Sequence, residues 1–235
     1  MAFRTQTATL LIFFGAHLAR AQDLSFPVRH DHLHKGGEGI LTFTEEIVRW
    51  EENKKPEHSR SWRYAEIQRL ELARGHVHIL TYEDVGWQFG RDREYRFDHL
   101  PAELPTRLHP FLTAHMGQRY LAHLADPSVT PVWEVPAKLL LGRSGSNGRL
   151  KVAAAQIVFD GGERGESRTW KVSDITNVNS SGPFELTFTT IEGENRLQLK
   201  DPLNEDRYQD LWQTVSQFHG LKVFQSTTVH EHPTR

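Results

Sequence analysis

The stretch Ser59-Arg-Ser-Trp-Arg-Tyr-Ala-Glu-Ile67 decides the fold, because it returns as Ser167-Arg-Thr-Trp-Lys-Val-Ser-Asp-Ile175. Four of the nine positions are identical without a gap, a fifth pairs serine with threonine, and two more keep their charge. A match of this kind that includes a tryptophan indicates an internal repeat. We therefore expect two copies of one unit in this chain of 235 residues.

The sequence around each copy follows the same order. A Gly-x-Leu triplet, Gly39-Ile-Leu41 or Gly148-Arg-Leu150, comes before it. A helical pattern closes each unit, over residues 205–218 after the candidate N-cap Asn204 and over residues 104–115 in the first copy. The first helical pattern is weaker, because Pro110 should kink or break a helix.

Between the triplet and the helix, both copies consist of short segments that are rich in β-branched and aromatic residues. Residues 77–82 and 186–189 alternate as half-buried strands do, and turn signals such as Gly161-Gly162 separate the segments. The sequence therefore predicts a mainly β chain with C-terminal helices, of the α+β class.

This order resembles the bacterial pleckstrin-homology-like and GRAM-like domains. A Gly-x-Leu strand, a tryptophan strand that leads to an acidic residue and isoleucine, and a closing helix with an aromatic-Leu-Trp stripe recur in them. The resemblance covers essentially all of the chain after its leader. It implies two β-barrel or sandwich modules, each of about seven antiparallel strands closed by one α-helix. Such scaffolds bind lipids, peptides or no known ligand, so the resemblance alone assigns no function.

The N-terminus has the order of a secretory signal peptide. Arg4 precedes an apolar run from Ala8 to Ala16, and the small-residue sequence Ala19-Arg20-Ala21 follows. The alternative is a membrane anchor, but the run is shorter than the roughly 20 residues of a spanning helix. We expect cleavage near Ala21 and a periplasmic or extracellular protein.

These signals divide the chain into six segments. They are the signal peptide at 1–21, a histidine-containing segment at 22–38, the first module at 39–122, a linker at 123–147, the second module at 148–222 and a tail at 223–235.

Composition excludes several functions. With 28 Lys and Arg against 30 Asp and Glu, the chain lacks the basic excess that binds nucleic acid. It has no cysteine, and neither a G-x-S-x-G nor an H-E-x-x-H motif. The sequence therefore predicts a non-catalytic protein with no resident cofactor.

One cluster of histidines stands out before the first module. His30, His32 and His34 would project from one face of an extended strand and could together hold a zinc ion. The alternative is structural, with His30 and His32 capping or pairing with the edge of the barrel.

The repeated arginines, Arg60 and Arg168, could grip an anion. The structural alternative is that each stacks on the neighbouring tryptophan or pairs with Glu66 or Asp174. The residues expected in the core are Trp62, Ile67, Trp170, Ile175, Leu211 and Trp212.

These observations favour a binding or interaction protein that acts outside the cytoplasm on a protein partner. Two alternatives stay open. One is attachment to a membrane surface or to anionic headgroups, and the other is a metal-dependent hydrolase that uses the His30–His34 cluster.

Overall fold

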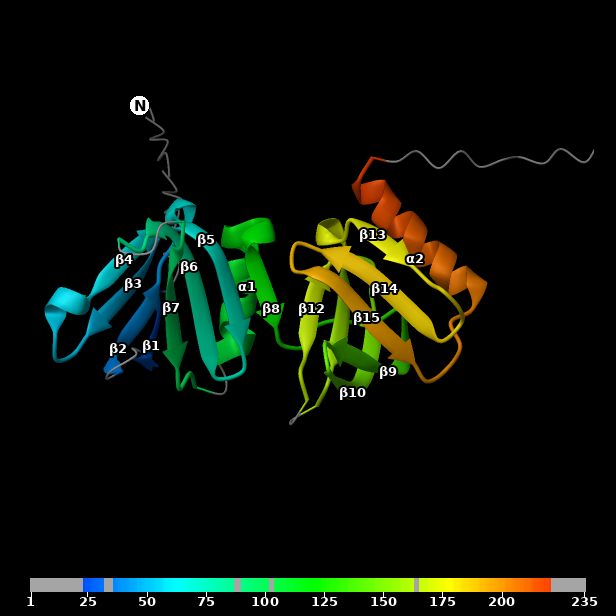
Figure 1. The fold of residues 1–235 in the computed structure, drawn as a ribbon, viewed down its shortest axis with the longest axis horizontal. Helices are drawn as coiled ribbons and strands as arrows, with labels where there is room; N and C mark the ends of the chain where they lie inside the picture. Colours follow the sequence, from blue (N-terminus) through cyan, green and yellow to red (C-terminus); the bar gives the residue numbers. More distant parts are fainter. Residues whose placement is uncertain (1–22, 32–35, 87–89, 102–103, 163–164, 221–235) are drawn as a thin grey trace, which may run out of the picture.

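The computed structural model describes residues 23–31, 36–86, 90–101, 104–162 and 165–220. They form a mainly β structure with two α-helices, as the sequence predicts (Figure 1). In chain order the elements are β1 (Leu24–His30), β2 (Gly37–Phe43), β3 (Ile47–Glu52), η1 (Pro56–His58), β4 (Arg60–Arg63), η2 (Tyr64–Glu66), β5 (Ile67–Ala73), β6 (His76–Asp84), β7 (Asp92–Asp98), α1 (Leu104–Met116), η3 (Gly117–Arg119), β8 (Tyr120–His123), β9 (Trp133–Leu141), β10 (Ser144–Val152), β11 (Gln156–Asp160), β12 (Arg168–Lys171), η4 (Val172–Asp174), β13 (Asn177–Asn179), β14 (Glu185–Thr190), β15 (Gly193–Leu199) and α2 (Glu205–Phe218), where η marks a 3-10 helix.

The strands form a single hydrogen-bonded sheet of 15 strands, in the order β13-β14-β15-β9-β10-β11-β12-β8-β5-β6-β7-β1-β2-β3-β4. The expectation of two separate barrels or sandwiches is therefore corrected, because backbone pairing continues from one half of the chain to the other. The order within the halves is nevertheless the same. Raising each strand number in β5-β6-β7-β1-β2-β3-β4 by eight gives β13-β14-β15-β9-β10-β11-β12.

Strand β8 joins the two halves. It runs parallel to β5 over four residue pairs, from Leu70–Tyr120 to Ala73–His123. On its other side it pairs with β12 through Thr169 and Ala122. All other neighbouring strands of the described part of the chain are antiparallel. Figure 1 shows α1 and β8 between the two halves.

The buried apolar side chains form two clusters, one in each half. The first runs from Phe26 to Leu124 and the second from Val135 to Val215. We refer to residues 23–124 as the first half and to residues 133–220 as the second half.

The repeated sequence has the same local structure in both halves. A four-residue strand, β4 or β12, leads into a three-residue 3-10 helix and then to a fully buried isoleucine, Ile67 or Ile175. The tryptophan of each strand is buried, with 2% of Trp62 and 4% of Trp170 exposed. The serine that opens each copy accepts a hydrogen bond from a backbone N–H, of Glu52 or Gly161.

The glycine of each Gly-x-Leu triplet sits where another strand approaches closely. A Cβ on Gly39 would lie 2.0 Å from the carbonyl oxygen of Glu51, and one on Gly148 would lie 2.1 Å from that of Asp160. Only glycine fits such an approach. The leucine two residues on is buried in both halves.

Each half begins one strand earlier than the sequence indicated. The expected boundaries at 38/39 and 147/148 fall inside β2 and β10, and the expected linker at 123–147 contains β9. Both missed strands, β1 and β9, contain a proline. Pro27 in β1 lies opposite Ile40 and Pro136 in β9 lies opposite Arg149, at matching positions of the repeat. Each proline comes before the residues that pair with the strand on the other side, β7 for β1 and β15 for β9. The N–H that proline lacks is therefore not needed for that second pairing.

The helices depart from expectation in two ways. Pro110 does not end α1, which is continuous through it. Trp212 is not in the core, since 36% of it is exposed, whereas Leu211 and Val215 on the same helix are buried. Helix α2 packs on η4 and β13 through the face that carries Leu211 and Val215, and Trp212 is turned about 100° away from Leu211. Within the described residues, neither helix has the length and apolarity needed to cross a bilayer.

We predict that replacing Trp62 or Trp170 with alanine lowers the free energy of unfolding by about 3–5 kcal/mol, because each change leaves a large cavity in a core. Chemical denaturation of each variant measures this loss. Trp212→Ala is the control and should cost much less. A loss below about 1 kcal/mol at either buried tryptophan would contradict the packing described here.

Candidate functional site at the junction of the two halves

Buried polar groups gather where the two halves meet. Nδ1 of His109, on α1, is hydrogen bonded to the hydroxyl of Tyr120, on β8, at 2.7 Å. Nε2 of the same ring lies 3.4 Å from Oδ2 of Asp126, which follows β8. All three residues are buried. The junction therefore holds a carboxylate–imidazole–phenol series, with the imidazole in the middle.

The segment after β8 holds Asp126 in place. Oδ1 of Asp126 accepts hydrogen bonds from the backbone N–H and the hydroxyl of Ser128, at 2.9 and 2.7 Å. Its own N–H donates to the hydroxyl of Thr169 on β12, and that hydroxyl donates to the carbonyl of Leu124. The polar series is thus tied to the second half as well as to the first.

Burial sets the protonation states of the series. It lowers the pKa of His109, although the neighbouring Asp126 opposes the shift. It raises the pKa of the Tyr120 hydroxyl well above the usual value. Burial alone would raise the pKa of Asp126, but the hydrogen bonds from Ser128 and the proximity of His109 outweigh it and lower that pKa. At neutral pH the series is a carboxylate, a neutral imidazole and a protonated phenol.

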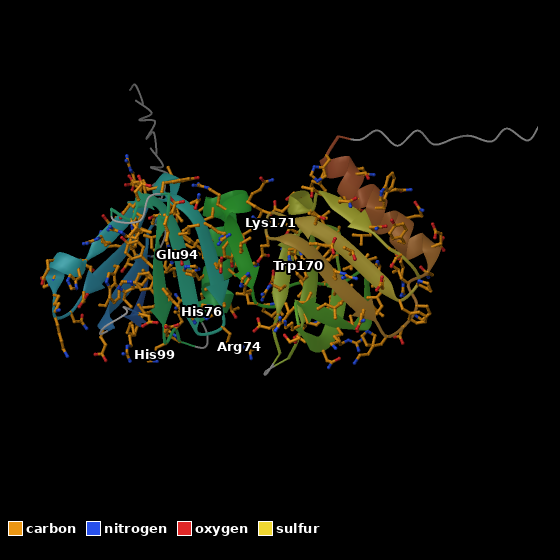
Figure 2. All side chains as sticks on the ribbon, in the orientation of Figure 1. Arg74, His76, Glu94, His99, Trp170 and Lys171 are labelled. Atoms are coloured by element: carbon orange, nitrogen blue, oxygen red, sulfur yellow. The ribbon has the colours of Figure 1, made fainter. Side chains whose placement is uncertain are left out.

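Lys171 reaches across the junction from β12 (Figure 2). Its ammonium group donates to the carbonyl oxygens of Gly117 and Thr113, at 3.1 and 3.4 Å, at the C-terminal end of α1. Burial lowers the pKa of Lys171, against the opposing effect of Asp174. A cation at the C-terminus of a helix satisfies open carbonyls and complements the helix dipole.

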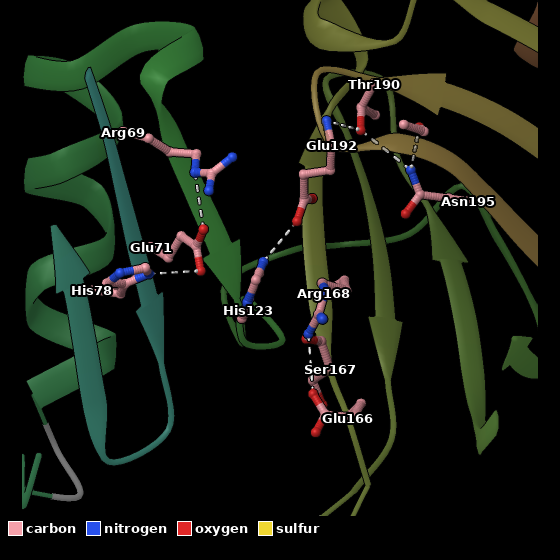
Figure 3. A network of polar contacts seen from close by, with 11 residues as sticks. Arg69, Glu71, His78, His123, Glu166, Ser167, Arg168, Thr190, Glu192 and Asn195 are labelled. Carbon is pink, nitrogen blue, oxygen red and sulfur yellow. Dashed lines mark hydrogen bonds and ion pairs between the residues drawn. The ribbon is translucent and has the colours of Figure 1, made fainter. Parts of the chain in front are cut away.

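A second cross-junction contact lies at the far end of β8. His123 Nε2 and Glu192 Oε1 are 2.8 Å apart (Figure 3). On the first half, Glu71 takes Arg69 and His78 as partners, at 3.0 and 3.6 Å. The hydrogen bond to Glu71 raises the pKa of His78, although burial opposes the shift.

The cavity at this junction is small. Its volume is about 30 Å³, and His109, Tyr120, Trp170, Lys171 and Glu192 are among its lining residues. A cavity of this size holds one or two water molecules, whereas pockets for small molecules occupy roughly 300–1,000 Å³. The titratable groups here are also engaged with one another, and they link the two halves.

A larger hollow, of about 330 Å³, lies between residues 180–183 and the first turn of α2. Its serines are already engaged: Ser180 donates to the carbonyls of Gly182 and Glu185, and Ser181 bonds to the carboxylate of Glu185. Glu205 supplies negative charge at the helix N-terminus.

Both repeated arginines donate hydrogen bonds to neighbouring backbone carbonyls. Arg60 donates to the carbonyls of Glu57 and Ser59, and Arg168 donates to the carbonyl of Ser167 and to Glu166. The expected pairing with Glu66 or Asp174 is corrected: Glu66 pairs with Arg63, and Arg168 pairs with Glu166. In both copies the arginine binds the carbonyl of the serine before it.

The histidine cluster is only partly within the described residues. His30 is 3% exposed, and its ring lies among Trp50, Tyr95 and Phe97 at centroid distances of 5.0–5.8 Å. His32 and His34 lie outside the described residues. Among the residues that are described, no three acids or histidines are grouped as metal ligands.

Sequence reasoning missed the series of His109, Tyr120 and Asp126. His109 lies next to Leu108 in the apolar stripe of a helical pattern, and Asp126 lies in the stretch interpreted as a linker. Only the docking of β8 brings them together, and no spacing in the sequence encodes that contact.

Comparison with known proteins adds little. No family model matches the chain, and no curated protein matches it. Among solved structures it aligns with one titled "Structure of the Spt16D Pob3N heterodimer", at a TM-score of 0.34 and 17% identity over 72% of this chain and 84% of that one. A second, the C-terminal domain of an unknown protein from Leishmania infantum, gives a TM-score of 0.31 and 11% identity over 39% and 80% of the two chains. Neither alignment is close enough to carry an argument.

The lowered pKa of His109 predicts an acid-sensitive junction. An unfolded histidine takes up a proton near pH 6.5, while folded His109 resists it, so stability falls as pH drops through about 6.5 towards the folded pKa. Urea unfolding at pH 7.5 and 5.5 should show that His109→Gln removes part of this loss.

His78 supplies a control of opposite sign. Its raised pKa contributes stability that is present at acidic pH and is lost as pH rises through the folded pKa, so His78→Gln should lose more stability on acidification than the original chain. Equal pH dependence in the original chain and His109→Gln would contradict the assignment.

Proposed function

We propose that this chain is an exported, non-catalytic interaction protein built from two copies of one pleckstrin-homology-like module. The duplication is supported by the repeated strand order, by the shared strand–turn–isoleucine frame, and by the matching positions of Pro27 and Pro136. The non-catalytic assignment is supported by the size of the junction cavity. The burial of His30 among aromatic rings disfavours the metal-dependent hydrolase.

The single observation that supports an interaction function is that the equivalent strands β12 and β4 have different neighbours on their outer sides. Strand β12 of the second half is covered by β8 on its outer side. Its counterpart in the first half, β4, is the last strand of the described sheet and pairs only with β3. The outer side of β4 is therefore the place where a further strand fits.

The backbone of β4 is oriented for this role. The N–H of Arg63 donates to the carboxylate of Glu66 at 2.8 Å, so it faces away from β3. Because alternate residues of a strand direct their N–H groups to the same side, the N–H of Ser61 also faces outward. Ser61 is the counterpart of Thr169, the residue through which β12 pairs with β8.

The occupant we infer is an extended segment of a protein partner, which adds to the edge by main-chain hydrogen bonds. Attachment to anionic headgroups is less well supported, since it needs a concentration of positive charge. Two cations near this edge have carboxylate partners: Arg63 pairs with Glu66 and Arg49 with Glu51.

A synthetic peptide of the β8 sequence, residues 119–126, tests the edge. Titrated into the protein and followed by the amide signals in nuclear magnetic resonance, it should shift residues 59–63 selectively and to saturation. Ser61→Pro removes the outward N–H but none of the bonds to β3, so it should abolish the shifts.

Ser61→Ala is the matched control. It keeps the N–H and should retain peptide binding with at most a small loss. Shifts that spare residues 59–63, or that persist unchanged in Ser61→Pro, would overturn the proposed use of this edge.

Export is tested separately. The protein recovered from the periplasm or the medium of an expressing bacterium should begin at Gln22, as N-terminal sequencing would show. A product that begins at residue 1 and stays in the cytoplasm would contradict this proposal.

A further inference from the structure

The two halves share a threonine and a glutamate at equivalent places. Thr81 and Glu83 lie in β6, whereas Thr190 ends β14 and Glu192 lies in the turn after it. Both pairs are separated by 109 positions, as are the two Gly-x-Leu triplets. In each half the hydroxyl of the buried threonine accepts a hydrogen bond from the backbone N–H of the glutamate, at 3.3 Å. Glu83 and Glu192 are therefore equivalent residues.

In the first half, Glu83 binds the buried tryptophan of the repeat. Its Oε1 accepts a hydrogen bond from the indole N–H of Trp62 at 3.3 Å. Its Oε2 accepts one from the hydroxyl of Tyr95 at 3.1 Å. The indole N–H is a donor only, and a buried one normally has an acceptor. Glu83 supplies that acceptor.

In the second half the equivalent glutamate is directed elsewhere. Oε1 of Glu192 lies 2.8 Å from Nε2 of His123, across the junction (Figure 3). The counterpart of Trp62 is Trp170, which is 4% exposed, and its indole N–H has no hydrogen-bond partner among the described residues. A buried donor without an acceptor is unfavourable, because it has lost its hydrogen bonds to water.

Glu192 is within reach of this donor. Glu192 and Trp170 both line the junction cavity of about 30 Å³. That volume is about the share of one molecule in liquid water, so a carboxylate oxygen can occupy it. The contact of Glu192 with Thr190 uses the backbone N–H, so a rotation of the Glu192 side chain leaves it intact.

The two positions of the Glu192 side chain use different parts of the molecule. The contact with His123 exists only while β8, which carries this histidine, is docked against the second half. A contact with Trp170 uses groups of the second half alone, and it provides the buried indole with its acceptor. The group released is His123, whose side chain is 17% exposed and can be hydrated.

We propose that Glu192 is a latch with two positions. In one it holds the junction closed on His123, and in the other it turns into the cavity and accepts the indole N–H of Trp170, as Glu83 accepts that of Trp62. The latch couples loosening of the junction to a tryptophan in the core of the second half. The inference rests on the duplication, but it does not depend on whether β4 binds a partner.

Nuclear magnetic resonance of the indole N–H groups tests the latch on the full chain. The signal of Trp170 is assigned by its loss in Trp170→Phe. His123→Ala removes the junction partner of Glu192, so the indole N–H of Trp170 should gain a charged acceptor. Its signal should move downfield, and its exchange with solvent should slow by roughly tenfold.

Glu192→Ala is the matched control. Combined with His123→Ala, it should abolish both effects and give the same Trp170 signal as Glu192→Ala alone. His123→Leu keeps bulk at the junction but cannot donate, so it guards against loss of folding and should act as His123→Ala does. In the first half, Glu83→Ala should move the signal of Trp62 upfield and leave that of Trp170 in place, which calibrates the size of the shift.

Two results would overturn the proposal. One is a Trp170 signal that responds to His123→Ala equally with and without Glu192. The other is a Trp170 signal that responds to Glu192→Ala alone as fully as Trp62 responds to Glu83→Ala, which would place Glu192 on Trp170 while the junction is closed. The Trp170 readouts use no peptide, so failure here is distinguishable from failure of the proposed partner site.

Discussion

The structure depends on one short strand, β8, because it alone carries the hydrogen bonding of the sheet from one half to the other. Its pairing is unequal, with four residue pairs to β5 and a single pair to β12. One backbone pair cannot fix the orientation of two halves. Side chains supply the remainder: Thr169 binds the segment after β8, Lys171 binds the end of α1, and His123 meets Glu192. Such a seam is polar because it must satisfy the carbonyls and N–H groups that sheet pairing leaves open.

Duplication gives the two halves the same edges but different neighbours. The edge of β12 and the side of β5 are joined through β8, while the equivalent edge of β4 and side of β13 lie at the two ends of the described sheet. An exposed strand edge is a template for pairing, and folded proteins leave one uncovered mainly where it is short or used. The N–H of Arg63 is already bound to Glu66, so the part of the β4 edge that is open to a further strand is the region of Ser61. Strand β12 likewise pairs with β8 through a single residue, Thr169.

Most of the strands and both helices could be predicted from the sequence, whereas the contacts of the junction could not. The repeated frame predicted the β4–η2 and β12–η4 segments. The Gly-x-Leu triplet predicted a strand in each half. The structure explains its glycine, because a Cβ there would lie about 2 Å from a backbone carbonyl oxygen. Strand β9 was missed because Pro136 favoured a linker, and β1 because the segment before Gly39 was considered only for its histidines. Alternation placed His30 on one face of a strand but could not show that this face is inside. His109 and Asp126 meet only through tertiary contacts between segments with no shared pattern.

The buried titratable groups of the junction are held by one another. A catalytic acid or base must exchange its proton with a substrate, so it needs an accessible atom and a pKa near the working pH. His109 has its two ring nitrogens directed at Tyr120 and Asp126, and burial moves the pKa of His109 down and that of Tyr120 up. The series therefore holds its protons where they are at neutral pH. Replacing one member would leave a buried partner unsatisfied, which costs more than the hydrogen bond itself contributes. That asymmetry ties the polar seam to one relative orientation of the two halves.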